Sequence, residues 1–198
     1  MSEEYVTVAG GGEGTYEERG SEFVGYVAPA TEEDEAEGFV DGVREQRPDA
    51  TRHVSAYRVR NGGTVRGIYD DDGEPSGSAG KPVLELLRGE EAENAVAVVV
   101  RHYGGTKLGY GGLVRAYTEA AKRALNDAGT RVDVPRAKLR VEVGYDDSGT
   151  VRDVLESESV PFDAEYEEAV VFTVRPSAAD IDALQERLLS ATSARARL

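Results

Sequence analysis

The sequence predicts an α+β fold in two domains, residues 1–134 and residues 135–198. Three observations predict it. Runs typical of strands alternate with amphipathic helices, Pro135 marks a linker, and the elements after it follow the order β-α-β-β-α. At 198 residues, with 39% hydrophobic and 31% charged residues, the chain can bury a real core and is globular.

Side-chain periodicity predicts the elements of the first domain. In chain order we expect a strand at 23–28, a helix after Thr31, a hairpin of 54–59 and 64–69, a short helix at 82–88, a strand at 94–100 and a helix at about 112–127. Asn61-Gly62-Gly63 is a strong hairpin turn signal, and Thr31 with Asp34 matches a capping box. The stretch at 10–14 is expected to be flexible. The core stripe of the last helix is expected to be Val114, Tyr117, Ala121, Leu125 and Ala128.

The second domain has a different rhythm. After Pro135 we expect a strand at 138–143, a helix at 149–158, strands at 163–167 and 169–175, and a helix capped by Ser177. This order, in a segment of this size, is typical of a small ferredoxin-like domain. The final strand of that fold has no counterpart in the sequence.

Composition excludes several classes of protein. The chain has no cysteine, which rules out disulfides and thiolate metal sites. It has no run of about 20 apolar residues and begins with an acidic segment, so we expect a cytoplasmic protein without a membrane span or secretory signal. A net charge of −15, with 19 arginines among its 23 basic residues, is the pattern of a halophilic protein, since high salt screens acidic self-repulsion.

Two segments depart from this acidic background. Residues 50–69 contain no acid, and residues 101–123 contain five basic residues against Glu119 alone. We interpret them as parts of an anion-binding face. The alternative is chance clustering of arginines, because closeness in sequence does not fix closeness on the surface.

Residues 70–82 and 101–117 combine glycines with cations. Glycines ahead of a helix expose backbone N–H groups at the positive end of its dipole, where an anion binds well. We expect a phosphate- or nucleic-acid-binding site made of Lys81, Arg101, Lys107, Gly109, Gly111, Gly112, Arg115, Arg58, Arg60 and Lys122. The alternative is that the glycines only permit tight packing of a strand against a helix.

Established phosphate and metal motifs do not fit these segments. Gly80-Lys81 lacks the spacing of a P-loop, and residues 109–114 lack the third glycine of a dinucleotide fingerprint. The acids of residues 70–74 fail as an EF-hand because Pro75 occupies its glycine position, so a turn held by Asp71 is the favoured interpretation. The two histidines have no nucleophile motif around them. We therefore expect no catalytic residue, no cofactor and no metal.

Both segments resemble the signatures of a known family. Residues 70–82 (DDDGEPSGSAGKP) and 101–117 (RHYGGTKLGYGGLVRAY) are similar, almost residue for residue, to those of the IMPACT family, which includes the bacterial YigZ proteins. Residues 22–29 and 49–57 resemble its opening strand and its Asp-Ala-Thr-His strand. Gly20, Arg52 and His102 depart from the family pattern. The residues of the first motif loop are Asp71, Glu74, Pro75, Ser76, Gly77 and Gly80.

The resemblance covers about residues 16–128 and, more loosely, the second domain. It implies a ribosomal protein S5 domain 2-like fold followed by a domain resembling one of an elongation factor. With the acidic composition, it indicates a haloarchaeal member. Eukaryotic relatives regulate translation, which implies a regulator that binds RNA or the ribosome, with a protein partner in translation control as a further expectation.

Three functions remain open at this point. An RNA-binding regulator, which is not an enzyme, requires one contiguous positive face, with Tyr57, Tyr103 and Tyr110 as candidates for stacking on bases. An enzyme acting on a small phosphorylated or nucleotide ligand requires cations converging in an enclosed pocket, namely Lys81, Lys107 and Arg115. A protein-interaction module requires an exposed apolar patch.

Overall fold

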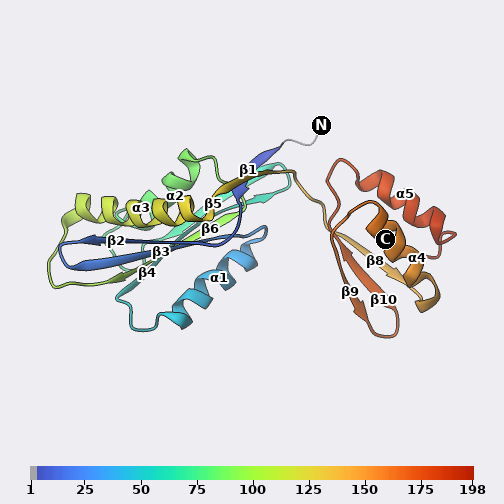
Figure 1. The fold of residues 1–198 in the computed structure, drawn as a ribbon, viewed down its shortest axis with the longest axis horizontal. Coiled ribbons are helices and arrows are strands. Elements are labelled where there is room, and N and C mark those ends of the chain that lie inside the picture. The colour runs from blue at the N-terminus through green and yellow to red at the C-terminus, as the bar shows by residue number, and fades with distance from the viewer. Residues whose placement is uncertain (1–3) are drawn as a thin grey trace. The chain divides into compact units, whose positions relative to one another are not determined.

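The computed structural model describes residues 4–198 and contains two compact α+β units, Tyr5–Asp133 and Val134–Leu198 (Figure 1). No helix within these described residues is both long enough and apolar enough to cross a membrane.

The first unit is built on an antiparallel five-stranded sheet of order β2-β3-β6-β4-β5. A separate two-stranded ribbon pairs β1 with β7. Figure 1 shows α2 and α3 on one side of the sheet and α1 on the other. The elements are β1 (Tyr5–Val8), β2 (Gly12–Glu18), β3 (Ser21–Pro29), α1 (Glu33–Gln46), β4 (Arg52–Asn61), β5 (Thr64–Asp70), α2 (Gly80–Gly89), β6 (Ala95–His102), α3 (Gly109–Ala128) and β7 (Thr130–Asp133).

The central strand β6 is covered on both faces. Ala97 and Val99 pack into the cluster that includes α2 and α3, whereas Val96 and Val98 pack into the cluster with α1. A strand buried on both sides has no solvent-facing positions, which explains why its sequence is almost continuously apolar. The predicted central strand is therefore confirmed, as is the hairpin of β4 and β5.

The expectation that the stretch at 10–14 is flexible was wrong. Gly12 and Gly14 belong to β2, which pairs with β3 beneath α3. A Cβ built on Gly12 would lie 2.2 Å from the carbonyl oxygen of Ala124, and one built on Gly25 would lie 2.4 Å from that of Ala120. The glycines are thus packing residues, because they let the helix backbone approach the sheet.

The same close approach corrects the core stripe predicted for α3. Tyr117, Ala121 and Leu125 are buried as expected, but Val114 lies at the edge of the stripe, half-buried. The face turned to the glycine strands carries small side chains instead, which bulky residues could not replace without lifting the helix. Its buried residues are Leu113, Ala116, Tyr117, Ala120, Ala121, Ala124 and Leu125.

The predicted capping box at α1 was also wrong in its partner. Thr31 donates from both its backbone nitrogen and its hydroxyl to Glu35, at 2.7 and 2.8 Å, rather than pairing with Asp34. The helix begins at Glu33, one position later than it would if Thr31 were its cap. The carboxylate of Glu35, four residues after Thr31, is therefore the one that Thr31 can reach.

The second unit has the element order that the sequence predicts. It comprises β8 (Leu139–Val143), α4 (Tyr145–Ser157), β9 (Phe162–Tyr166), β10 (Val170–Val174) and α5 (Ile181–Ala191). The strands form an antiparallel sheet of order β8-β10-β9. Alternate residues of β8 and β10 are buried with Val151, Leu155, Leu184 and Leu188 of the two helices. The helices therefore cover one face of this sheet.

The sequence predicts no final strand in the second unit, and the structure has only a short backbone bridge at that position. Arg197 and Glu142 exchange two backbone hydrogen bonds, at 2.8 and 2.9 Å, on the free edge of β8. Two positions are too few for a strand of their own, so the sequence carries no strand pattern there. Arg195 holds the tail in place by donating to both carboxylate oxygens of Asp147, at 2.8 and 2.6 Å.

Replacing Gly25 by Ala should destabilise the first unit because the new methyl group would meet the Ala120 carbonyl 2.4 Å away. We expect a loss of about 1–3 kcal/mol in the free energy of unfolding, measured by urea denaturation. Gly38→Ala is the matched control, because Gly38 lies in α1 with nothing within 4 Å of a built Cβ. That variant should be neutral or more stable. Equal losses in the two would contradict the close approach of α3.

The hydrogen bonds from Arg195 lower the pKa of Asp147. A carboxyl group with a lowered pKa in the folded state stabilises above its unfolded pKa, near 3.9, and loses that contribution as the pH falls through its folded pKa. Asp147→Asn should therefore speed amide exchange in β8 and in residues 192–198 at neutral pH, measured by hydrogen-exchange mass spectrometry. The difference from wild type should disappear in acid. Asp153→Asn, on the same helix, should leave exchange unchanged at both pH values.

Candidate functional site

The two glycine-containing segments meet at one edge of the five-stranded sheet. Strand β6 ends there at His102, and the neighbouring strand β4 begins there, with Arg52 directly opposite Arg101. Helix α3 follows the loop after β6, and Tyr110 in its first turn donates from its hydroxyl to the Gly77 carbonyl oxygen at 3.0 Å. This bond links the second segment to the first.

A cleft of about 510 Å³ opens between these segments. It contains three cationic side chains, one carboxylate and two tyrosines whose exposed fractions are 48% for Tyr103 and 57% for Tyr110. The residues that line it are Thr51, Arg52, Glu74, Pro75, Arg101, Tyr103, Lys107, Leu108, Gly109, Tyr110 and Leu113.

Glu74 is the centre of a buried network below the cleft. One of its carboxylate oxygens accepts hydrogen bonds from Arg101, at 2.6 Å, and from the hydroxyl of Tyr117, at 2.7 Å. Burial, strengthened by that hydrogen bond, raises the pKa of Tyr117 far above its ordinary value, so the phenol stays a donor. The network ties the loop after β5 to the end of β6 and to α3.

Arg101 retains an unused donor in this network. Its guanidinium lies 5.6 Å from the ring centre of Phe23 and 5.2 Å from that of Tyr103, and only 6% of the residue is exposed. Its Nε–H is buried and finds no acceptor among the described residues. A buried donor left without an acceptor is destabilising by about 1–3 kcal/mol, so this N–H is the one unsatisfied group found among the described residues of the network.

The acids of the first segment hold the loop itself. Asp71 accepts from the backbone nitrogens of Gly77, Ala79 and Gly80, at 2.7–3.1 Å. The first amides of α2 are therefore already occupied by a carboxylate. The Asp72 carboxylate accepts a hydrogen bond from the backbone nitrogen of His53 at 2.7 Å. No metal-binding group of three His, Asp or Glu side chains occurs within residues 4–198.

The N-terminus of α3 is different. Leu108 precedes it, and this residue has no side-chain acceptor that could cap the first turn. Gly109 has φ of +71°, a conformation that favours glycine, whereas a Cβ on Gly111 would meet nothing within 4 Å. Packing therefore does not require a glycine at position 111.

The structure distributes the predicted cations unevenly. Arg101 and Lys107 line the cleft together with Gly109, Glu74 and Pro75. Lys81 lies beside it, because a Cβ on Gly77 would be 3.8 Å from the Lys81 side chain. Gly111 and Gly112 follow the lining residues in the first turn of α3, Ser76 and Gly77 follow Pro75, and Gly80 begins α2. Arg115 and Lys122 are exposed farther along α3.

Arg58 and Arg60 are engaged elsewhere. Arg58 donates to the carbonyl oxygens of Leu87 and Ala92, at 3.3 and 2.8 Å, and burial lowers its pKa. Arg60 pairs with Glu93 at 2.7 Å. Both side chains hold α2 and the start of β6 against β4. They lie at one end of the β4–β6 pair, whereas Arg52 and Arg101 lie at the other end.

The cleft also contains residues whose role the sequence left undefined. Arg52 departs from the family pattern and belongs to the acid-free segment 50–69, and the structure shows that it lines the cleft opposite Arg101. Its position next to Arg101 depends on the β4–β6 register, which no local pattern reveals. Tyr57 is unavailable for stacking because it is buried against α1, with 4% exposed.

Several cations of the first unit have no carboxylate partner among the described residues, some at the cleft and some farther along α3. Within residues 4–198, no ion pair to a carboxylate is found for Arg52, Lys81, Lys107, Arg115 or Lys122. Of Lys81, Lys107 and Arg115, only Lys107 lines the cleft, so the enclosed convergence required of an enzyme site is not formed.

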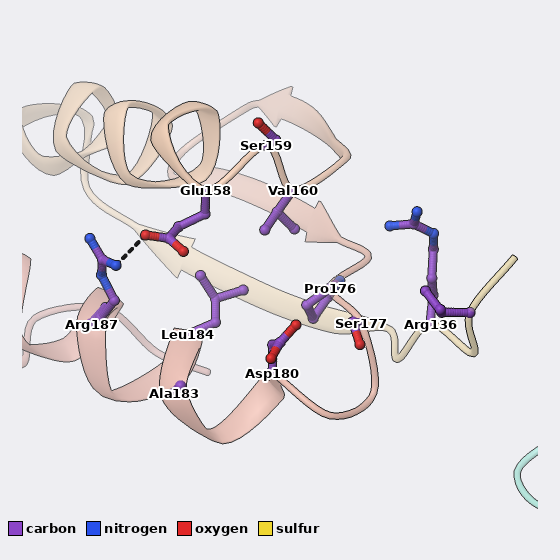
Figure 2. Close-up of a pocket in the computed structure, with 11 residues that line it drawn as sticks. Arg136, Glu158, Ser159, Val160, Pro176, Ser177, Asp180, Ala183, Leu184 and Arg187 are labelled. Carbon is purple, nitrogen blue, oxygen red and sulfur yellow. Dashed lines mark ion pairs between the residues drawn. The ribbon is translucent and has the colours of Figure 1, made fainter. Parts of the chain in front are cut away.

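A second hollow, of about 300 Å³, lies within the second unit beside α5 (Figure 2). Its arginines are already engaged. Arg187 turns toward Glu158 in an ion pair, and Arg136 donates to the carbonyl oxygen of Arg175 at 3.3 Å. This hollow therefore has fewer free cationic groups for binding an anion than the cleft of the first unit has.

Comparison with known proteins gives consistent matches to both units. Residues 19–125 match the model of the Impact N-terminal domain, and residues 141–195 match a domain of unknown function, DUF1949. The chain is 32% identical over 197 residues to IMPACT family member YvyE of Bacillus subtilis, covering 98% of this chain and 89% of that protein.

Two further matches agree. IMPACT family member YigZ of Escherichia coli is 37% identical over 126 residues, which cover 63% of this chain and 62% of that protein. A crystal structure described as that of a hypothetical protein is 29% identical, covers 100% of this chain and 97% of that chain, and has a TM-score of 0.72.

Glu74→Gln should destabilise the first unit strongly, because it leaves the Arg101 charge buried without its partner. Their side chains are 6% and 8% exposed, and breaking such a pair is destabilising by about 3–5 kcal/mol. Glu85→Gln is the control, since its pair with Arg88 is about half exposed and should contribute about 0–1 kcal/mol. Urea denaturation followed by circular dichroism measures both. Similar small losses would show that the pair is not a buried one.

Proposed function

The chain belongs to the IMPACT family, and we propose that it regulates translation by binding single-stranded RNA, free or on the ribosome, through the cleft of its first unit. One observation carries the proposal. Three cations and two exposed tyrosines line the same hollow on a protein whose net charge is −15.

The chemistry of the lining matches an unpaired nucleotide. Exposed tyrosine rings offer stacking surfaces to bases, and stacking of one base contributes about 1–3 kcal/mol. Arg52 and Lys107 supply charges for the phosphate backbone. A duplex hides the faces of its bases, so a single strand is the form that can use both kinds of contact.

The acidic charge restricts where RNA can bind. An overall charge of −15 repels a polyanion, so binding has to be confined to the positive edge around the cleft. The same charge, with arginine replacing lysine almost throughout, supports our proposal of a haloarchaeal, salt-adapted protein. Under high salt, phosphate contacts weaken and stacking on Tyr103 and Tyr110 becomes the more durable part of the interaction. A role in translation places the protein in the cytoplasm.

The finer fold assignments are part of the proposal. The antiparallel sheet of the first unit, with two helices on one face, supports an S5 domain 2-like fold. The β8-β10-β9 order, with the Arg197 bridge on the outer edge of β8, supports a ferredoxin-like second unit, whose fourth strand would stand at that edge.

RNA binding can be measured with a fluorescently labelled single-stranded RNA of about 12 nucleotides by anisotropy over a range of KCl concentrations. Lys107→Glu should weaken binding by roughly tenfold and flatten its salt dependence, since one phosphate contact is lost. Tyr110→Ala should weaken binding by roughly 10–100-fold at every salt concentration, because it removes a stacking surface.

Each variant has a matched control. Lys122→Glu makes the same charge change on the same helix but away from the cleft, and Tyr166→Ala removes an equally exposed tyrosine from the second unit. Both should retain wild-type affinity. Loss of binding in all four variants, or failure of the wild-type protein to bind, would reject the cleft as an RNA site.

A further inference from the structure

We propose that the cleft recognises a nucleotide that carries a terminal phosphate, with the phosphate between Arg52, Arg101, Lys107 and the first turn of α3, and with the base against Tyr110. This inference builds on the proposed function, because it takes the same cleft and specifies which part of a nucleic acid it reads. A free nucleoside monophosphate presents the same chemistry as the 5′-phosphorylated end of an RNA.

Charge is the first support. Arg52, Arg101 and Lys107 face a single carboxylate, Glu74, so the lining of the cleft carries two net positive charges. A terminal phosphate carries about −1.5 to −2 at pH 7, whereas a phosphodiester carries one negative charge. A terminal phosphate therefore neutralises the lining, and an internal phosphate leaves one charge uncompensated.

The unpaired donor of Arg101 is the second support. Its terminal nitrogen is engaged by Glu74 at 2.6 Å, but the buried Nε–H has no acceptor among the described residues, and the residue lines the cleft. Phosphate oxygens are strong acceptors of guanidinium hydrogen bonds. A ligand oxygen that drew the Arg101 side chain toward the cleft would give this buried N–H an acceptor and remove its penalty.

The contrast between two helix N-termini is the third support. Both α2 and α3 begin at this edge of the sheet, but the first amides of α2 are taken by Asp71. The residue before the 20-residue α3 is Leu108, which has no side-chain acceptor for the amides of the helix's first turn, and Gly109 contributes to the lining. An anion on the cleft floor would meet these amides as well as the Arg101 donor.

Size is consistent with one nucleotide. Sites for small ligands range over roughly 300–1,000 Å³, and the cleft measures about 510 Å³. Tyr110 is held by its hydrogen bond to Gly77, so its ring is a fixed wall for a base while the hydroxyl stays engaged.

The test compares two forms of one short RNA, with a 5′-phosphate and with a 5′-hydroxyl, by competition against the labelled RNA. Wild-type protein should bind the phosphorylated form roughly tenfold more tightly, as expected for charge-assisted hydrogen bonds to one additional charge. Arg52→Gln and Lys107→Gln should each remove most of that preference. Lys122→Gln is the matched control and should retain it, and all variants should keep the wild-type circular dichroism spectrum.

AMP and adenosine distinguish the two sources of the ligand. Competition by AMP but not by adenosine would extend the site to free nucleotides, and failure of AMP to compete while the 5′-phosphate preference persists would restrict it to RNA ends; both support the inference. Equal affinity for the two RNAs overturns it and leaves the proposed RNA binding intact. Binding of AMP without either RNA, measured directly by calorimetry, retains phosphate recognition and rejects RNA binding, and binding of no probe rejects both.

Discussion

The contact on which the first unit depends is the buried hydrogen-bond network of Glu74, Arg101 and Tyr117. Its three members come from a loop, the end of the central strand and the middle of a helix, so one carboxylate oxygen joins three parts of the chain that are distant in sequence. Two opposite charges in a dry environment require good geometry and additional hydrogen bonds, and the Tyr117 hydroxyl supplies one. The cleft has its shape because this network fixes its floor.

Much of the architecture was predictable from local pattern, because burial on one or both faces of a strand leaves a direct imprint on the sequence. The continuous apolar run of β6 and the two-residue turn between β4 and β5 are examples. What failed was local information whose meaning depends on a distant partner. Taken alone, Gly12 and Gly14 indicate flexibility. Beneath α3 they are required because any side chain at these positions would clash with the helix.

The candidate site shows the same division. Glycines and cations of the two segments were recognisable, and the structure brings Arg101 and Lys107 into one cleft. The sequence alone could not show that Arg58 and Arg60 lie outside the cleft. Both belong to β4, but Arg58 donates to backbone carbonyl oxygens and Arg60 pairs with a carboxylate elsewhere in the fold. Arg52 became prominent only through its register opposite Arg101.

The glycine strands beneath α3 have a mechanical consequence for the cleft. They contact the C-terminal half of a 20-residue helix, whose first turn contributes to the cleft about 20 Å away along its axis. An added methyl group beneath this half would push the helix away from the sheet, and a tilt of the helix axis would displace the cleft-lining first turn without touching it. The shape of the cleft therefore depends on small residues at the far side of the first unit, where none of them touches it.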